Sequence, residues 1–139
     1  MAAGAEEIQV EVVGIVEQDV AVRNQQQRIP VVVLRDQATR EVQIPVGSCE
    51  GFAIQIALEQ HHVPRPLTHD LALHLMEKLS ARLERVVIDA LSAHIAHATL
   101  HLSSNEGSLT MDARPGDGIA LALRADVPIY VTENIFSES

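Results

Sequence analysis

Apolar and polar positions alternate along the first third of the chain in a way that is typical of strands. Between Ile8 and Val16, apolar residues recur mostly at every second position, which is the period of a strand with one buried face. Residues 29–34, IPVVVL, are apolar on both faces, which predicts a central strand that is buried from both sides. Residues 41–46 are another candidate strand, and the polar stretch RDQATR before it suits a hairpin loop.

Two helices are predicted in the middle of the chain. Ser48 is a candidate N-cap for a helix over residues 49–60, with Glu50 in the first turn, where the helix dipole favours negative charge. The stretch HHVPRPL follows, and its two prolines block helix and keep the chain extended. Thr68 is the candidate N-cap of a second helix over residues 68–80. The apolar stripe of this helix consists of Leu71, Ala72, Leu75, Met76 and Leu79.

Strand-like patterns return in the last part of the chain. Residues 82–90 and 95–102 read as paired strands, and the turn SSNEG leads into a third strand over residues 108–114. Pro115 suits the first position of a third helix that reaches about residue 124. Residues 128–132 are the last candidate strand.

This order of strands and helices is not a strict alternation of strand and helix. It therefore predicts an α+β fold, in which one mixed β-sheet is covered by about three helices. No repeat or linker divides the chain. We expect a single domain over residues 8–135, preceded by a flexible tail at residues 1–7.

Composition narrows the classes of function. Apolar residues make up 47% of the 139 residues and aromatic residues only 2%, so the core must be built from aliphatic side chains. So few rings nearly exclude the recognition of nucleic acid bases on an aromatic stacking platform. The net charge of −9 is opposite in sign to the basic surface that duplex-binding modules usually carry.

The location of the protein is predicted from what the sequence lacks. Cys49 is the single cysteine, so no disulfide forms within the chain, which fits a reducing compartment. The first ten residues have neither the basic region nor the apolar core of a signal peptide. No stretch approaches the roughly 18 apolar residues of a membrane span. We expect a cytoplasmic protein that does not contact membranes.

Three stretches carry a resemblance to the bifunctional nuclease domain family. They are IPVGSCEGFAIQIAL at residues 44–58, RPLTHDL at 65–71, and DARPGDGIALALR at 112–124, which is followed by PIYV. The joint spacing of RPLTHDL and the DARPxD pattern is specific, and the similarity covers about residues 8–135. The resemblance implies DNase and RNase activity, but it brings no catalytic mechanism that could be carried over.

The chain departs from the usual family pattern at several positions. Gly51 and Gly118 stand where Ala is usual, Gly116 stands where Ser is usual, and Pro45 replaces an aromatic residue. The run HIAHA, residues 94–98, aligns with a stretch that usually holds two adjacent aromatic residues. If those rings contact nucleic acid in relatives, that contact is missing here.

Ionisable residues concentrate in the second and third of these motifs. The candidate site consists of Arg65, His69, Asp70, Asp112, Arg114 and Asp117. Both motifs lie at predicted helix starts, where backbone N–H groups favour anions. Carboxylates that hold Mg²⁺ or Mn²⁺ and arginines that clamp phosphate oxygens are the groups that phosphodiester hydrolysis needs.

We expect the two motifs to meet in space, because each alone offers too few groups to hold a metal ion and a phosphate. Each candidate has an expected role. His69, Asp70 and Asp117 are the candidate catalytic residues, and the two aspartates are also the candidate metal ligands. Arg65 and Arg114 are the candidate substrate-binding residues. Glu50, Thr68 and Asp112 are expected to support them, and Asp112 could orient Arg114 from the same strand face.

An architectural interpretation explains the same residues. Thr68 and Asp70 could simply cap and complement a helix, and the arginines could pair with the carboxylates in a network that braces two helix starts. The other histidines carry a weaker signal, and the adjacent His61 and His62 read as plain loop residues.

Two functions from different classes therefore stand. The first is a metal-assisted nuclease that acts on DNA and RNA with Mg²⁺ or Mn²⁺. The second is a non-catalytic oligomeric module that binds a small anionic ligand or a partner protein. In either case the long strands rich in Val and Ile predict a homo-oligomer, most simply a dimer, because monomers usually hide such surface and edges.

Overall fold

The computed structural model describes residues 6–92 and 95–138. The predicted α+β class is confirmed, because one mixed sheet of seven strands carries helices on its faces. The sheet order is β3-β2-β1-β7-β4-β5-β6, and only the central β7–β4 pair is parallel. The strands are β1 (Glu7–Val22), β2 (Gln25–Asp36), β3 (Glu41–Pro45), β4 (Ala81–Ser92), β5 (Ile95–Ser104), β6 (Gly107–Ala113) and β7 (Ile129–Thr132).

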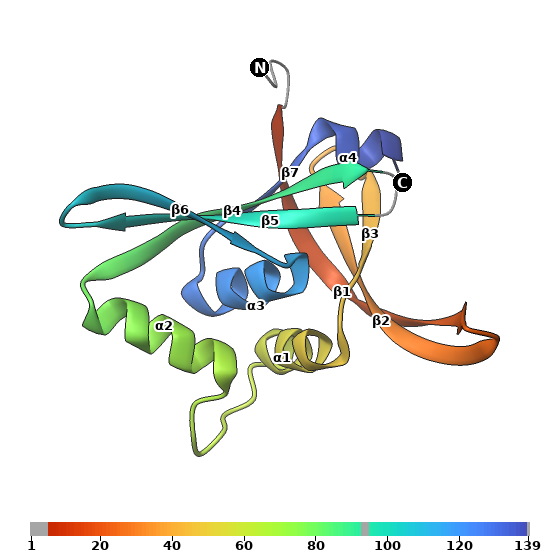
Figure 1. Ribbon diagram of the computed structural model, residues 1–139, viewed down its shortest axis with the longest axis horizontal. Helices are drawn as coiled ribbons and strands as arrows, with labels where there is room; N and C mark the ends of the chain where they lie inside the picture. The colour runs from red at the N-terminus through yellow and green to blue at the C-terminus, as the bar shows by residue number, and fades with distance from the viewer. Residues whose placement is uncertain (1–5, 93–94, 139) are drawn as a thin grey trace.

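The helices occupy different layers. They are α1 (Ser48–Glu59), α2 (Thr68–Lys78), α3 (Pro115–Ala125) and the short α4 (Glu133–Glu138). The first three lie on one side of the sheet, with α3 between the sheet and α1, while α4 lies near β7 and β3 (Figure 1). No helix among the residues that the structure describes has the length and apolar composition needed to cross a membrane.

The central position of α3 follows from its small residues. A Cβ atom added to Gly116 would lie 2.7 Å from the Cβ of Glu50 on α1, and one added to Gly118 would lie 2.8 Å from Val86 on β4. Because glycine has no side chain at these two positions, α3 can pack closely against both α1 and β4. Ile119, Ala120 and Ala122 are fully buried by this packing, so the start of α3 is fixed from two sides.

The predicted burial of the strand IPVVVL is confirmed for residues 31–34. Val31 to Leu34 are all buried, because β2 lies inside the sheet between β1 and β3. However, β1 and β2 run much further than the alternation indicated, as far as a tight turn in which Arg23 and Asn24 both have positive φ. Positive φ at both central residues is the turn geometry that matches strand twist in two-residue hairpins. The result is a ribbon that projects from the body of the domain (Figure 1).

The prediction that the apolar stripe of α2 is buried is wrong for part of that stripe. Ala72 and Met76 do pack against the core, together with Leu73. Leu71, Leu75 and Leu79 are instead 51%, 56% and 78% exposed. The predicted stripe was wider than the single face that α2 turns toward α3 and β4, and its outer half lies in solvent.

The expected tail at residues 1–7 lies mostly outside the described residues. Where the structure begins to describe the chain, it is already part of the fold, because the carbonyl of Glu6 accepts the N–H of Glu133 and β1 starts at Glu7. His94, in the HIAHA run, also lies outside the described residues.

Candidate functional site

The two charged motifs meet in space, as the chemistry of the sequence predicted. His69 Nε2 lies 2.9 Å from Asp117 Oδ1, which joins the first turn of α2 to the first turn of α3. The two residues are 48 positions apart in sequence. Their contact places RPLTHDL and DARPGD at one corner of the helical layer.

Asp117 extends this contact toward α1. Its second oxygen, Oδ2, accepts a hydrogen bond of 2.9 Å from Arg114 Nε, and Arg114 Nη2 lies 3.9 Å from Glu50 Oε2. Glu50 Oε1 in turn accepts the backbone N–H of Gly47 at 3.1 Å. A line of four side chains, in which basic and acidic residues alternate, therefore crosses the N-termini of α1, α2 and α3. The order is His69, Asp117, Arg114 and Glu50.

The helix starts are capped differently from the prediction. Gly47, not Ser48, is the N-cap of α1, and Leu67, not Thr68, is the N-cap of α2. Neither predicted cap accepts a hydrogen bond through its hydroxyl in the residues that the structure describes. The caps come instead from carboxylates three residues further on: Glu50 accepts the N–H of Gly47, and Asp70 accepts the N–H of Leu67 at 2.9 Å. Pro115 takes the first helical position of α3, as predicted.

The surroundings of Asp117 favour its ionised form. Partial burial raises its pKa, but hydrogen bonds from His69 and Arg114 act the other way and together outweigh burial, so the net pKa lies below its usual value. The hydrogen bond from Arg114 to Asp117 also raises the pKa of that guanidinium. The pair is therefore a stable carboxylate beside a stable cation. The Arg114 side chain is 72% exposed, so its remaining donors face solvent.

The His69 ring is hydrogen-bonded at one nitrogen and buried at the other. Because a carboxylate can only accept, Nε2 carries the proton in the contact with Asp117. Nδ1 is buried and has no hydrogen-bond partner among the described residues. One ring nitrogen is thus engaged and the other is out of reach of water, so His69 couples α2 to α3 in this conformation.

Asp70 belongs to a different contact. Its Oδ1 accepts a 2.9 Å hydrogen bond from Arg124 Nε, while Oδ2 caps α2. Arg124 and Asp117 are seven residues apart on α3, which corresponds to about 10 Å along a helix axis. The hydrogen bonds of Asp70 go to Arg124 and Leu67, whereas those of Asp117 go to His69 and Arg114, so the two carboxylates share no partner among these bonds.

The donor set does not fit a resident metal ion. Across residues 6–92 and 95–138, no three histidine, cysteine or acidic side chains converge as they would around a cation. Both oxygens of Asp117 are already bonded, to His69 and Arg114. The expected use of Asp70 and Asp117 as joint ligands thus has no preformed geometry behind it.

The remaining candidates lie at the edge of this corner. Arg65 is exposed in the segment before α2 and has no ion pair among the described residues. The Asp112 carboxylate is 85% exposed and makes only a long contact of 3.4 Å with His97 Nδ1. Arg114 is oriented by Asp117, which is the role that Asp112 was expected to play. Cys49, in the first turn of α1, is exposed.

Arg124 is the charged residue that the sequence interpretation missed. Its side chain is only 8% exposed, and its Nη1 donates to the carbonyl of Ala120 at 3.2 Å. A buried guanidinium needs a carboxylate partner, and Asp70 supplies it. The available signal was an arginine directly after a run of small apolar residues in an otherwise buried helix.

Comparison with known proteins identifies the family of the chain. The chain matches the bifunctional nuclease domain over residues 32–139. An uncharacterized protein of Mycobacterium tuberculosis (strain H37Rv) is 39% identical over 117 residues, which cover 83% of this chain and 69% of that protein. Bifunctional nuclease 2 of rice (Oryza sativa subsp. japonica) is 27% identical over 111 residues, covering 76% of this chain but 34% of the rice protein. The chain belongs to the bifunctional nuclease domain family.

Proposed function

We propose that the protein hydrolyses phosphodiester bonds in DNA and RNA at the corner where α1, α2 and α3 begin. The observation that carries the proposal is the hydrogen-bonded line from His69 through Asp117 to Arg114. It holds an exposed guanidinium in a fixed orientation at a helix start. The names of the rice relatives, which are bifunctional nucleases, support the same substrate class.

Arg114 is the group that would bind the scissile phosphate. Asp117 engages its Nε, which leaves the outer face of an exposed guanidinium for non-bridging oxygens. The N-terminal turns of α1 and α3 add backbone N–H groups that favour an anion. Charge stabilisation of this kind is usually the largest contribution to catalysis of such a reaction. Arg65, on the neighbouring exposed segment, would hold the next phosphate.

The His69–Asp117 pair is the candidate for activating water. A carboxylate that stays ionised can accept a hydrogen bond from an approaching water through its remaining lone pairs, and His69 keeps it oriented. Because Nδ1 of His69 is buried, His69 itself can transfer a proton to or from a substrate only after its ring has moved. We therefore assign Asp117 the role of positioning the attacking water and His69 the role of orienting Asp117.

The proposed cleavage reaction includes Mg²⁺ or Mn²⁺ that is added to the assay. Mg²⁺ is commonly bound by one or two carboxylates together with substrate phosphates, so a complete protein cage is not required. The net charge of −9 opposes the approach of a polyanion, and divalent cations weaken that repulsion. We expect cleavage to need a divalent cation and to stop with EDTA.

The test is cleavage of plasmid DNA and of single-stranded RNA with Mg²⁺, Mn²⁺ or EDTA. Arg114→Ala should lower the rate by about a hundredfold or more, the scale for loss of one group that stabilises transition-state charge. Arg28→Ala is the matched control, because Arg28 is equally exposed but lies on the projecting ribbon. Equal rates for wild type and Arg114→Ala would place the activity elsewhere or in a contaminant.

One observation favours a second function. Both nitrogens of His69 are withdrawn from solvent, and Asp70 is bonded to a buried arginine, as in a network that only braces helices. The corresponding proposal is a non-catalytic module that binds an anionic ligand or a partner protein. Homogeneous protein that leaves plasmid and RNA intact at high concentration, with either metal, would support it over hydrolysis.

A further inference from the structure

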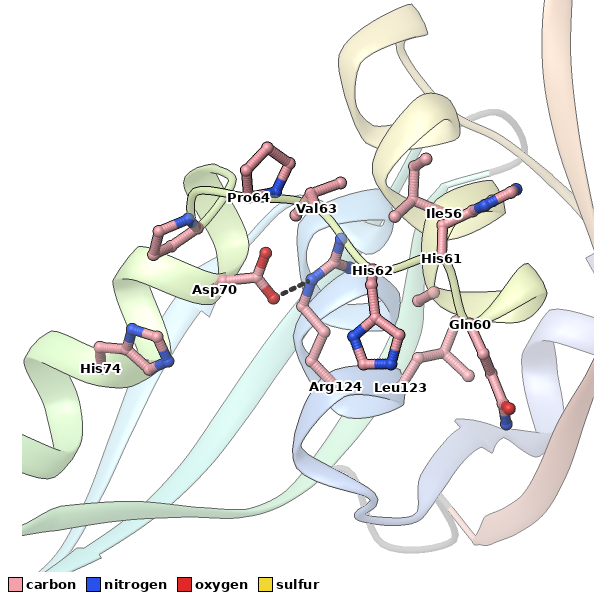
Figure 2. A pocket seen from close by; sticks show the side chains of 12 residues that line it. Ile56, Gln60, His61, His62, Val63, Pro64, Asp70, His74, Leu123 and Arg124 are labelled. Atoms are coloured by element: carbon pink, nitrogen blue, oxygen red, sulfur yellow. Dashed lines mark hydrogen bonds and ion pairs between the residues drawn. The ribbon is translucent and has the colours of Figure 1, made fainter.

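A groove beside the candidate site gathers histidines that the proposed hydrolysis does not use. It lies between the end of α1, the extended segment 61–66, the start of α2 and the last turn of α3, and it has a volume of about 380 Å³. Pockets for small ligands commonly measure roughly 300–1,000 Å³. His62, His74 and Arg124 point into the groove from three different elements (Figure 2).

The polar groups that line the groove offer hydrogen-bond donors to a ligand, but no carboxylate without a partner. Asp70, its one carboxylate, has both oxygens bonded, to the N–H of Leu67 and to Arg124 Nε. Arg124 Nη1 donates to a backbone carbonyl, and Nη2 has no hydrogen bond among the residues that the structure describes. His61 is paired with Glu59.

His62 and His74 complete the set of available groups. Both are exposed and lack a hydrogen bond or ion pair within the described part of the chain. Nitrogen donors on three sides of a hollow suit an anion with several oxygens. They do not suit a cation, because no three ligands converge on one point within the described residues.

The apolar wall of the groove adjoins its nitrogen donors. It consists of Ile56, Ala57, Val63, Pro64, Pro66 and Leu123. The two prolines fix the extended backbone of this wall, since each ring restricts its own φ and the residue before it. A rigid apolar wall beside a group of nitrogen donors matches a ligand with a flat ring at one end and an anion at the other.

We propose that this groove binds a nucleoside monophosphate, with the phosphate held by His62, His74 and Arg124 and the base against Val63, Pro64 and Pro66. The nucleotide is either free or the 5′-phosphorylated end of a strand, because both present the same chemistry. Binding does not require the protein to cleave anything, so the proposal stands apart from the nuclease activity.

Binding is measured by calorimetry with AMP, adenosine and inorganic phosphate as probes. AMP should bind well above both partial ligands. The double change His62→Ala and His74→Ala should weaken AMP binding by roughly tenfold or more, the scale for lost hydrogen bonds to a charged group. His97→Ala, a histidine change on β5 outside the groove, is the matched control and should bind AMP as the wild type does.

Several results would overturn the proposal. They are absence of AMP binding at millimolar concentration, equal affinity for adenosine and AMP, or an unchanged affinity in the double variant. Both histidines are exposed, so the melting temperature of the double variant should match that of the wild type and show that the fold is intact. A dinucleotide with and without a 5′-phosphate separates the sources: tight binding of the phosphorylated form alone identifies a strand end, and binding of AMP alone identifies a free nucleotide.

Discussion

Asp117→Asn separates the catalytic and architectural contributions of the corner. The substitution keeps the shape of the side chain and one acceptor oxygen, but it removes the charge. Its amide nitrogen must then face a donor, either His69 Nε2 or Arg114 Nε, where the wild type has a 2.9 Å hydrogen bond. One of the two contacts is therefore lost whichever way the amide turns.

The magnitude follows from exposure. A hydrogen bond to a charged group contributes about 1.5–3 kcal/mol when it is buried. Asp117 is 26% exposed and Arg114 is 72% exposed, and exposed ion pairs contribute only about 0.2–1 kcal/mol. We expect a loss of about 1 kcal/mol, or a fall in Tm of about 3–6 °C for a domain of this size.

The effect has a defined pH dependence. Because the pKa of Asp117 is lowered in the folded protein, its contribution to stability is present above the usual carboxyl pKa of about 4 and is lost as pH falls through the folded value. The Tm difference between wild type and Asp117→Asn should thus have its largest value at pH 7 and should shrink as the pH falls below 4.

Thermal unfolding followed by circular dichroism, at several pH values, measures this difference. Asp112→Asn is the control, because the same chemical change occurs in the same motif on a carboxylate that is 85% exposed, and its Tm should not move. A drop in Tm for Asp117→Asn that persists unchanged at pH 3 would refute the charge argument. Retained cleavage by this variant would remove Asp117 from the proposed chemistry.

Three further outcomes are expected. Gly116→Ser, although Ser is usual in relatives, should lower the free energy of unfolding in urea by about 1–3 kcal/mol, because its Cβ would lie 2.7 Å from Glu50 Cβ. Leu75→Lys should change that free energy by less than about 0.5 kcal/mol, whereas Met76→Lys should cost about 2 kcal/mol or more, because only Met76 packs on the core. The expected homo-oligomer predicts a mass of at least twice 15.1 kDa by light scattering at micromolar concentration, and a monomer mass would overturn it.

The fold was predictable where burial dictates sequence. The strand over Val31 to Leu34 had to be apolar on both faces because both faces are covered. The outer part of the β1–β2 ribbon was missed because most of its positions are polar and exposed. Its local signals were Val20 and Val22, which continue the apolar alternation of β1, and the Arg23–Asn24 turn. The split of the α2 stripe was also hidden, because leucine in solvent and leucine in the core look the same in sequence.

The site was predictable in its composition but only partly in its pairing. His69 and Asp117 were expected together because neither motif alone offers enough groups. Asp70 was expected to join them, yet adjacent residues on a helix point about 100° apart, so His69 and Asp70 reach different turns of α3. Its partner, Arg124, could not be identified before the packing of α2 against α3 was known.

The position of β7 has a consequence for the order of synthesis. This strand is the last in the chain, yet it lies in the middle of the sheet, between β1 and β4. Until residues 129–132 leave the ribosome, β3-β2-β1 and β4-β5-β6 are two separate sheets, and the inner edges that β7 later pairs, at residues 7–10 of β1 and 86–88 of β4, have no partner strand. Such edges are templates for pairing with other chains. The nascent protein therefore completes its sheet in a single late step, and a chain that stops before Ile129 should aggregate as it is made.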